Sequence, residues 1–113
     1  MRSYSRTREA AGLLFVAGIL GRDGDDLVDG GPAAEVAQSL VNLEAAIAPH
    51  GVDRTAVARL VVYTTDLSAA AAIDAVFAEF FPEPRPVRTM VEVAALPAAA
   101  TAEVEATCEL GAR

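Results

Sequence analysis

The sequence predicts a two-layer α/β sandwich with the element order β-β-α-β-α-β-β, in which a mixed sheet carries both helices on one face. Three observations predict this class. Two segments carry apolar residues at helical spacing, five segments show the alternation or short apolar run of strands, and no linker or long repeat divides the chain. The length of 113 residues suits one domain, which we expect to span residues 1–113.

The N-terminal half is expected to contain two strands, a loop and a helix. Tyr4–Glu9 alternates loosely, and Leu13–Ala17 is a short apolar run between two glycines. Four Gly and four Asp make Gly21–Pro32 a predicted loop, and its final proline suits the first turn of a helix. The helix is expected over Ala33–Pro49, because apolar residues form one stripe along it: Val36, Leu40, Leu43 and Ile47.

The C-terminal half is expected to contain a strand, a helix and two further strands. Ala58–Thr65 is rich in Val and Tyr, and a helix follows with apolar residues at helical spacing: Ile73, Val76, Phe77 and Phe80. Three prolines within residues 82–86 end that helix. The alternating segments Val87–Val93 and Ala102–Leu110 are the last two predicted strands.

The alternation also assigns side chains to faces. We expect the sheet face away from the helices to carry Arg88, Met90, Glu103 and Glu105. A sheet with one uncovered face favours self-association, which would add to the burial available to a small domain.

Composition excludes several classes of function. Nine basic and sixteen acidic residues give 9 − 16 = −7, which argues against nucleic acid or an anionic membrane as the main partner. All nine basic residues are Arg, so Schiff-base and P-loop lysines are excluded. Cys108 and His50 are the only residues of their kind, which excludes Cys-rich and His-rich metal sites. We interpret Cys108 as a core residue and His50 as a helix-end residue, and a reducing cytoplasm is the expected compartment.

Two residue types point to chemistry. Arg88 stands in a strand otherwise made of Val, Thr, Met and Glu, and its guanidinium can hold a carboxylate with two hydrogen bonds or simply form a salt bridge. Glu103, Glu105 and Glu109 alternate on the final strand. They form either a solvated face or a set in which one partly buried glutamate handles a proton. Tyr4 and Gly18 are further candidates, as a hydroxyl donor and as a place where a ligand could approach the backbone.

Several segments together resemble a known family. The stretch Val87–Pro97, of the pattern R-x-x-V-E-V-x-x-L-P, is followed by Ala102–Ala106, and both resemble the C-terminal signature of the RidA family of enamine/imine deaminases. Similar matches run along nearly the whole chain in the right order: Tyr4-Ser5, Val16-Ala17-Gly18, Gln38–Asn42, Val62–Leu67 and Ile73–Phe81.

The resemblance implies a chorismate-mutase-like fold and a homotrimer with three clefts between subunits. It implies hydrolysis of 2-imino or enamine acids to 2-oxo acids and ammonia, without cofactor or metal. Carried over, Arg88 holds the carboxylate of a small-molecule substrate, and Glu103 positions or activates water. Tyr4, Gly18 and Met90 would line the pocket, and Ala17 would line it in place of a frequent Ser.

The pocket departs from the family pattern, which leaves the substrate side chain open. The departures are Ala17, Ile19, Asp74, Phe77 and Met90. Two alternatives therefore stand beside the deaminase: a non-catalytic trimer that binds small carboxylates, and a catabolic deaminase of the aminomuconate type.

Overall fold

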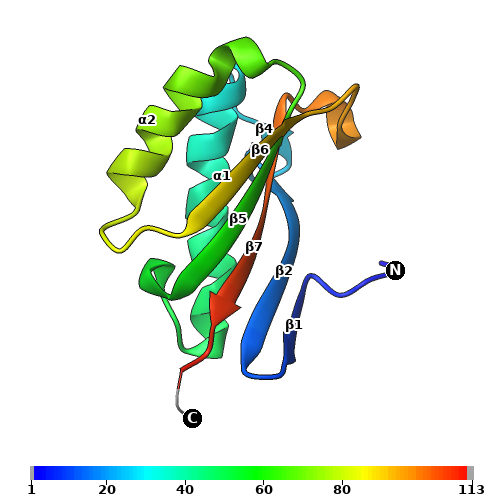
Figure 1. Ribbon diagram of the computed structural model, residues 1–113. Helices are drawn as coiled ribbons and strands as arrows, with labels where there is room; N and C mark the ends of the chain where they lie inside the picture. The colour runs from blue at the N-terminus through cyan, green and yellow to red at the C-terminus, as the bar shows by residue number, and fades with distance from the viewer. Residues whose placement is uncertain (1, 112–113) are drawn as a thin grey trace.

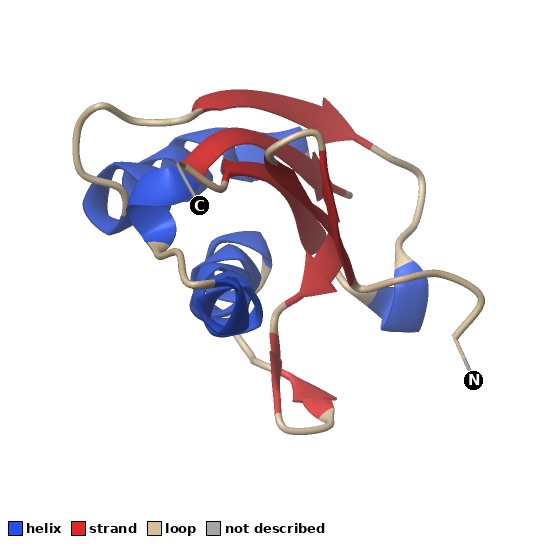
Figure 2. Cartoon of the chain, turned by 90° about the horizontal axis from the view of Figure 1, so that it is seen from below, coloured by secondary structure: helices blue, strands red, loops and turns tan. Residues whose placement is uncertain are grey.

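Two helices pack against one face of a five-stranded sheet in the computed structural model, which describes residues 2–111 (Figure 1). Seen from below, both helices lie on the concave side of the curved sheet (Figure 2). The helices are α1 (Pro32–Ile47) and α2 (Ala70–Phe80), and the sheet strands are β1 (Thr7–Ala10), β2 (Leu13–Leu20), β5 (Val57–Thr64), β6 (Val87–Glu92) and β7 (Ala102–Glu109). The predicted fold class is confirmed.

The sheet is mixed, as predicted. Its strand order is β1-β2-β7-β5-β6; β5 and β6 run parallel and the other neighbours antiparallel. The parallel pair needs a crossover connection, and α2 supplies it. Strand β6 is therefore an edge strand, with β5 between it and β7.

The hydrophobic core lies between the helices and the sheet. The predicted stripe of α1 is buried, as are Ile73 and Phe77 of α2. They meet alternate residues of the central strands, among them Leu60 and Val62 of β5 and Val104 of β7. Cys108 belongs to this core, as predicted, and burial raises the pKa of its thiol to about 11.

Two local predictions were wrong. The first strand covers only Thr7–Ala10, so Tyr4 precedes it rather than lying within it. The predicted loop at 21–32 contains a short hairpin of β3 (Arg22–Asp23) and β4 (Asp26–Leu27). These strands have two residues each, too few for an alternating pattern to appear in the sequence.

The predicted face of β6 was also wrong. Arg88 pairs with Leu60 and Met90 with Val62, and both β5 residues are fully buried under the helices. Arg88 and Met90 therefore lie on the helix-facing side of the sheet. The open side carries Thr89 and Val91 of β6, together with Glu103 and Glu105 of β7. Alternation separates two faces but does not say which one meets the helices, because a shift of one residue exchanges them.

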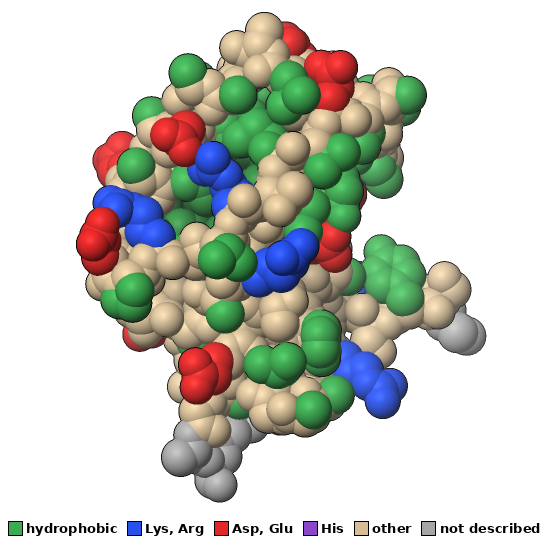
Figure 3. Space-filling model, viewed as in Figure 1, with side chains coloured by type: hydrophobic (Ala, Val, Ile, Leu, Met, Phe, Trp, Pro, Cys, Tyr) green, Lys and Arg blue, Asp and Glu red, His purple; other side chains and the backbone are tan. Residues whose placement is uncertain are grey.

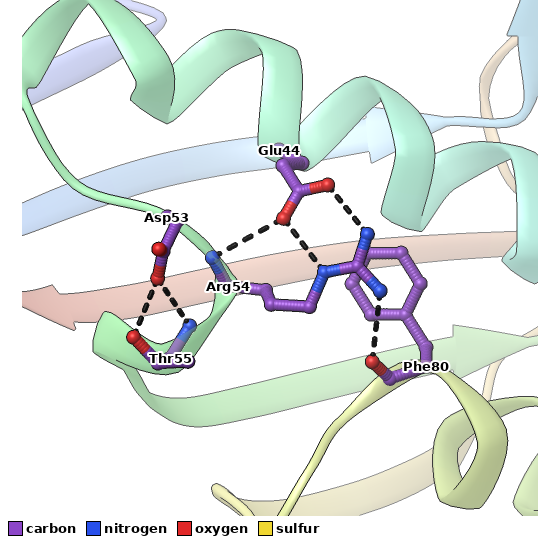
Figure 4. Close-up of polar contacts among 5 residues, drawn as sticks. All are labelled: Glu44, Asp53, Arg54, Thr55 and Phe80. Carbon is purple, nitrogen blue, oxygen red and sulfur yellow. Dashed lines mark hydrogen bonds and ion pairs between the residues drawn. The ribbon is translucent and has the colours of Figure 1, made fainter.

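The connection after α1 is tied to the end of α2 by one arginine. Arg54 donates from Nε and Nη2 to the two carboxylate oxygens of Glu44, at 2.7 and 2.6 Å, and from Nη1 to the carbonyl oxygen of Phe80 at 3.0 Å (Figure 4). Its guanidinium also lies over the Phe80 ring, 3.8 Å from the centroid. This contact fixes the packing of the two helices against each other.

His50 lies in a 3-10 turn after α1, at a helix end as predicted. Its ring also contacts β1, with Nε2 3.2 Å from the Thr7 hydroxyl and Nδ1 2.6 Å from the Glu9 carboxylate. The residue therefore joins the first edge strand to the helix layer.

Among the described residues, no helix has the length and apolar character needed to cross a membrane.

Candidate functional site

Arg88 lies in a cleft between α2 and the edge strand β6, which we call the arginine cleft. The cleft has a volume of about 480 Å³, and its lining residues are Leu60, Asp74, Phe77, Ala78, Phe81, Arg85, Pro86 and Arg88. On this side of the molecule, hydrophobic side chains gather between α2 and β6, with arginines at their border (Figure 3). The cleft therefore combines an apolar wall with positive charge.

The guanidinium of Arg88 is held loosely. One nitrogen, Nη2, donates to Oδ1 of Asp74 at 2.9 Å, and the guanidinium carbon lies 5.0 Å from the centroid of the Phe77 ring. The Arg88 side chain is 26% exposed and that of Asp74 is 66% exposed. An exposed ion pair with one hydrogen bond contributes at most about 1 kcal/mol, so a ligand carboxylate can replace Asp74.

Glu103 lies in a second hollow, which we call the glutamate groove. The groove has a volume of about 670 Å³ and runs past the start of the chain, the end of β2 and the β3–β4 hairpin. Its lining residues are Tyr4, Arg6, Gly18, Ile19, Leu20, Arg22, Gly24, Asn42, Ala45, Ala46, Pro97 and Glu103. Tyr4 is 61% exposed, and the guanidinium of Arg2 lies 5.9 Å from its ring centroid.

Gly18 makes room for the carboxyl group of Glu103. A Cβ at Gly18 would lie 2.7 Å from the carboxyl carbon of Glu103 and 2.9 and 3.0 Å from its oxygens. The pairing of β2 with β7 shifts register between Val16 and Ile19, so Gly18 lies in an irregularity of the strand. The group that lies against Gly18 within this chain is therefore Glu103, and the approach of a ligand there stays a prediction.

The environment of Glu103 favours its protonated form. Burial raises the pKa of the Glu103 carboxyl, and the negative charge of Glu105 on the same strand raises it further. A carboxyl with a raised pKa accepts and releases protons closer to neutral pH. A partly buried glutamate of this kind was one of the two possibilities expected for the final strand.

The start of β7 is fixed by a buried carboxylate of α1. Glu35 accepts hydrogen bonds from the backbone N–H of Thr101 at 2.8 Å, from its hydroxyl at 2.5 Å and from the N–H of Ala102 at 3.3 Å. The carbonyl of Thr101 accepts from the Thr64 hydroxyl at 2.8 Å. Two residues further along the strand, Glu103 therefore projects from a rigid backbone.

Ala17 and Glu105 lie beside the glutamate groove, on the open face of the sheet. Ala17 lines a neighbouring hollow with Glu105 and Phe15, and its N–H donates to the carbonyl of Arg6 at 2.9 Å. The hydroxyl of Tyr63 donates to the Glu105 carboxylate, and this hydrogen bond is the main cause that raises the pKa of Tyr63. Glu105 is thus engaged with Tyr63.

The structure divides the predicted site residues into two groups. Tyr4, Gly18 and Glu103 meet in the glutamate groove with Ala17 beside it, whereas Arg88 and Met90 lie on the other face of the sheet. The expectation that Arg88 and Met90 share a sheet face with Glu103 was wrong. Within residues 2–111, no three His, Cys, Asp or Glu side chains lie close enough together to hold a metal ion.

Asp74 and Phe77 were expected in the pocket as departures from the family pattern, and both contact Arg88. Two further residues were not among the predicted site residues. Arg6 and Arg22 line the glutamate groove with Glu103, and no local pattern marks them, because the fold brings them there from the segment before β1 and from β3.

Comparison with known proteins identifies the family to which this chain belongs. The model of the family described as Endoribonuclease L-PSP matches residues 1–110. The chain belongs to this family, which includes the Rid proteins. It is 31% identical to the 2-iminobutanoate/2-iminopropanoate deaminase of Bos taurus, covering 96% of this chain and 80% of that one. The resemblance inferred from the sequence is confirmed.

Other Rid relatives agree in sequence and in fold. A RutC family protein of Pyrococcus horikoshii is 33% identical, over 91% of this chain and 83% of its own. The crystal structure of RidA from an Antarctic Psychrobacter superposes with a TM-score of 0.89 at 31% identity, over 96% of this chain and 89% of that one. Some relatives are thus named as deaminases and others by family alone.

Proposed function

We propose that the protein hydrolyses 2-imino acids, or their enamine tautomers, to 2-oxo acids and ammonia. The observation that carries the proposal is the state of Arg88, a part-exposed guanidinium whose ion pair, with the mostly exposed Asp74, has a single hydrogen bond. Such a group can exchange its partner for the carboxylate of a substrate. The relatives named as imine deaminases support this reaction class.

The active site is proposed to form between two copies of the chain. Arg88 is on the edge strand β6 and faces the helices, while Glu103 faces the opposite side from β7. A small substrate cannot contact both groups within one chain, since alternate strands lie about 10 Å apart and the two side chains point away from each other. The arginine cleft of one copy and the glutamate groove of another would together supply the site.

The open face of the sheet supports self-association. Phe15, Val87 and Val91 are exposed there, at 43%, 63% and 38%, beside the Tyr63–Glu105 pair. Exposed apolar side chains on one sheet face are typical of a surface that another subunit covers. We propose a homotrimer in which the open faces meet and the edge strand of each copy lies next to the glutamate groove of its neighbour.

The proposed reaction places modest demands on the site. Arg88 would hold the substrate carboxylate and so fix the imine carbon. Glu103 would take a proton from water as the oxygen adds to that carbon, and would deliver the proton to the nitrogen. As the carbon–nitrogen bond of the resulting tetrahedral adduct breaks, Glu103 would pass the hydroxyl proton to the departing nitrogen, so that imine and water give a 2-oxo acid and ammonia. Gly18 keeps the Glu103 carboxyl against the backbone.

The test is hydrolysis of imines generated in place by an amino-acid oxidase, followed as release of 2-oxo acid. We expect the wild type to accelerate release, and Arg88→Ala and Glu103→Gln to lower the rate by about 100-fold or more. Asp29→Asn and Glu79→Gln remove exposed charges outside both hollows and away from the open sheet face, so they should match the wild type. Equal rates for Arg88→Ala and wild type would overturn the role of Arg88.

The same experiment addresses a non-catalytic role. Ala17 leaves no hydroxyl at the position where family members often carry Ser, which favours binding without turnover. Measurable binding of 2-oxo acids without acceleration of any imine would establish the protein as a carboxylate-binding module and contradict the proposed reaction.

A further inference from the structure

The glutamate groove carries positive charge although the protein as a whole is acidic. Its charged lining residues are Arg6, Arg22 and Glu103, so the groove holds 2 − 1 = +1 when Glu103 is ionised, in a chain of net charge −7. Glu103 is the only carboxylate among these lining residues, so it opposes at most one of the two arginine charges. An anion is the ligand that such a groove attracts.

The guanidinium groups of Arg6 and Arg22 form no ion pair with a carboxylate within the part of the chain described. Nη1 of Arg22 donates to a carbonyl oxygen, that of Asp25, at 2.7 Å, and no carboxylate forms an ion pair with Arg6 or Arg22 among the described residues. The aspartates of the β3–β4 hairpin follow Arg22 closely in sequence but do not line the groove. Both arginines thus keep donors available for a ligand.

The backbone on which each arginine stands is anchored to the groove. The carbonyl of Arg6 accepts from the N–H of Ala17, next to Gly18. The carbonyl of Arg22 accepts from the side-chain amide of Asn42 at 2.9 Å, and the same nitrogen donates to the carbonyl of Leu20 at 3.2 Å. Asn42 itself lines the groove. The fold therefore brings Arg6, from the segment before β1, and Arg22 of β3 to one hollow.

We propose that Arg6 and Arg22 form a second anion site and that the substrates are 2-imino acids with another carboxylate at the far end. This inference rests on the proposed function, because the first carboxylate is assigned to Arg88 of a neighbouring copy. Glu103 would then lie between the two anion sites, next to the imine carbon. A groove of about 670 Å³ has room for a chain of five or more carbons.

The test compares two product analogues of equal chain length. 2-Oxoglutarate ends in a carboxylate and 2-oxopentanoate in a methyl group, and calorimetry measures the binding of each to the full-length protein. We expect the wild type to prefer 2-oxoglutarate by about tenfold or more, as a charged hydrogen bond implies. The double variant Arg6→Gln/Arg22→Gln should lose this preference, while Arg6→Lys/Arg22→Lys, which keeps both positive charges in the groove, should retain most of it.

Any of three results would overturn the proposal of a second anion site. They are no preference in the wild type, no binding of 2-oxoglutarate at millimolar concentration, and a preference that survives in the Arg6→Gln/Arg22→Gln variant. Failure of the proposed function would look different, because binding is measured without turnover. Selective binding of 2-oxoglutarate by a protein that hydrolyses no imine would contradict the deaminase and leave the second anion site in place.

Discussion

Arg88 and Glu103 lie on opposite faces of the same sheet, with β5 between the strands that carry them. Each is accompanied by its own hollow, so one chain presents two incomplete halves of the proposed site. This relationship has a direct consequence for mixed oligomers.

Co-expressed Arg88→Ala and Glu103→Gln chains should complement each other. In a randomly mixed oligomer, half of the copies supply an intact Arg88 and half an intact Glu103, so about a quarter of the sites are whole. We expect the unfractionated mixture of oligomers to show about a quarter of the wild-type rate of 2-oxo acid release, although each variant alone is slowed by about 100-fold or more. Oligomers of Arg88→Ala with the Arg88→Ala/Glu103→Gln double variant should stay inactive. The absence of complementation would mean that the two residues do not share a site between copies.

Asp74→Asn should strengthen substrate binding. The asparagine oxygen can still accept the hydrogen bond of Arg88, but it no longer competes as an anion with the substrate carboxylate. We expect KM to fall by about two- to fivefold with little change in kcat, which matches the energy of an exposed ion pair. Steady-state kinetics measure this, with Asp74→Ala as the comparison. A rise in KM for both variants would show instead that Asp74 orients Arg88.

Gly18→Ala should lower activity without unfolding the protein. The added methyl group would contact only the flexible end of Glu103, so it should displace that carboxyl and reduce the rate by about 100-fold. Gly21→Ala is the matched control, because a Cβ there would lie 2.4 Å from the carbonyl oxygen of Glu35. That clash involves backbone, so Gly21→Ala should cost about 2 kcal/mol of stability in urea unfolding. Wild-type activity of Gly18→Ala would contradict the role given to Glu103.

Glu105→Gln should move the acid limb of the pH–rate profile to lower pH. Burial and the charge of Glu105 both raise the pKa of Glu103, and Glu103 must be ionised to accept a proton from water. Removing the charge of Glu105 removes the second cause only, so the limb should shift but stay above the value of an ordinary glutamate. Glu109→Gln, at the exposed end of the strand, should leave the limb in place.

The same pKa predicts the sign of a stability effect. Because the pKa of Glu103 is higher in the folded than in the unfolded state, folding favours the protonated form. The free energy of unfolding therefore falls as pH rises through the interval between the unfolded-state pKa and the folded-state pKa. Glu103→Gln should remove this fall, so relative to wild type it should gain stability above the folded-state pKa. Urea unfolding across the interval measures the difference. A parallel pH dependence in both proteins would contradict the raised pKa.

Arg54→Lys should destabilise the fold and leave the chemistry intact. A lysine cannot reproduce the two parallel hydrogen bonds to Glu44 or the contact with Phe80, and we expect a loss of about 1 kcal/mol, reduced by the partial exposure of the pair. Arg54 lowers the pKa of Glu44 mainly through its side-chain hydrogen bond. This stabilisation is therefore present above the unfolded-state pKa of Glu44 and lost as pH falls through the folded-state pKa. Urea unfolding at neutral and acid pH should show a difference between Arg54→Lys and wild type that shrinks in acid.

The family and the order of the elements could be predicted from the sequence because both depend on local patterns. The stripe of α1 and the run at Leu13–Ala17 specify their structures by spacing alone. The residue types at Arg88, Gly18 and Glu103 pointed to the candidate site, since a lone arginine in a strand, a glycine after an apolar run and alternating glutamates are visible without a structure. The hairpin at residues 22–27 was too short to be seen in this way.

Only the tertiary structure decided which face each side chain occupies. Alternation in β6 is equally compatible with Arg88 over the helices or on the open face, and pairing with Leu60 of β5 settles the choice. The approach of Glu103 to Gly18 joins two strands, and the glutamate groove likewise joins Arg6 and Arg22 from distant parts of the chain. Spacing along the chain determines local structure, whereas the side chains that share a hollow depend on strand register and on the packing of layers.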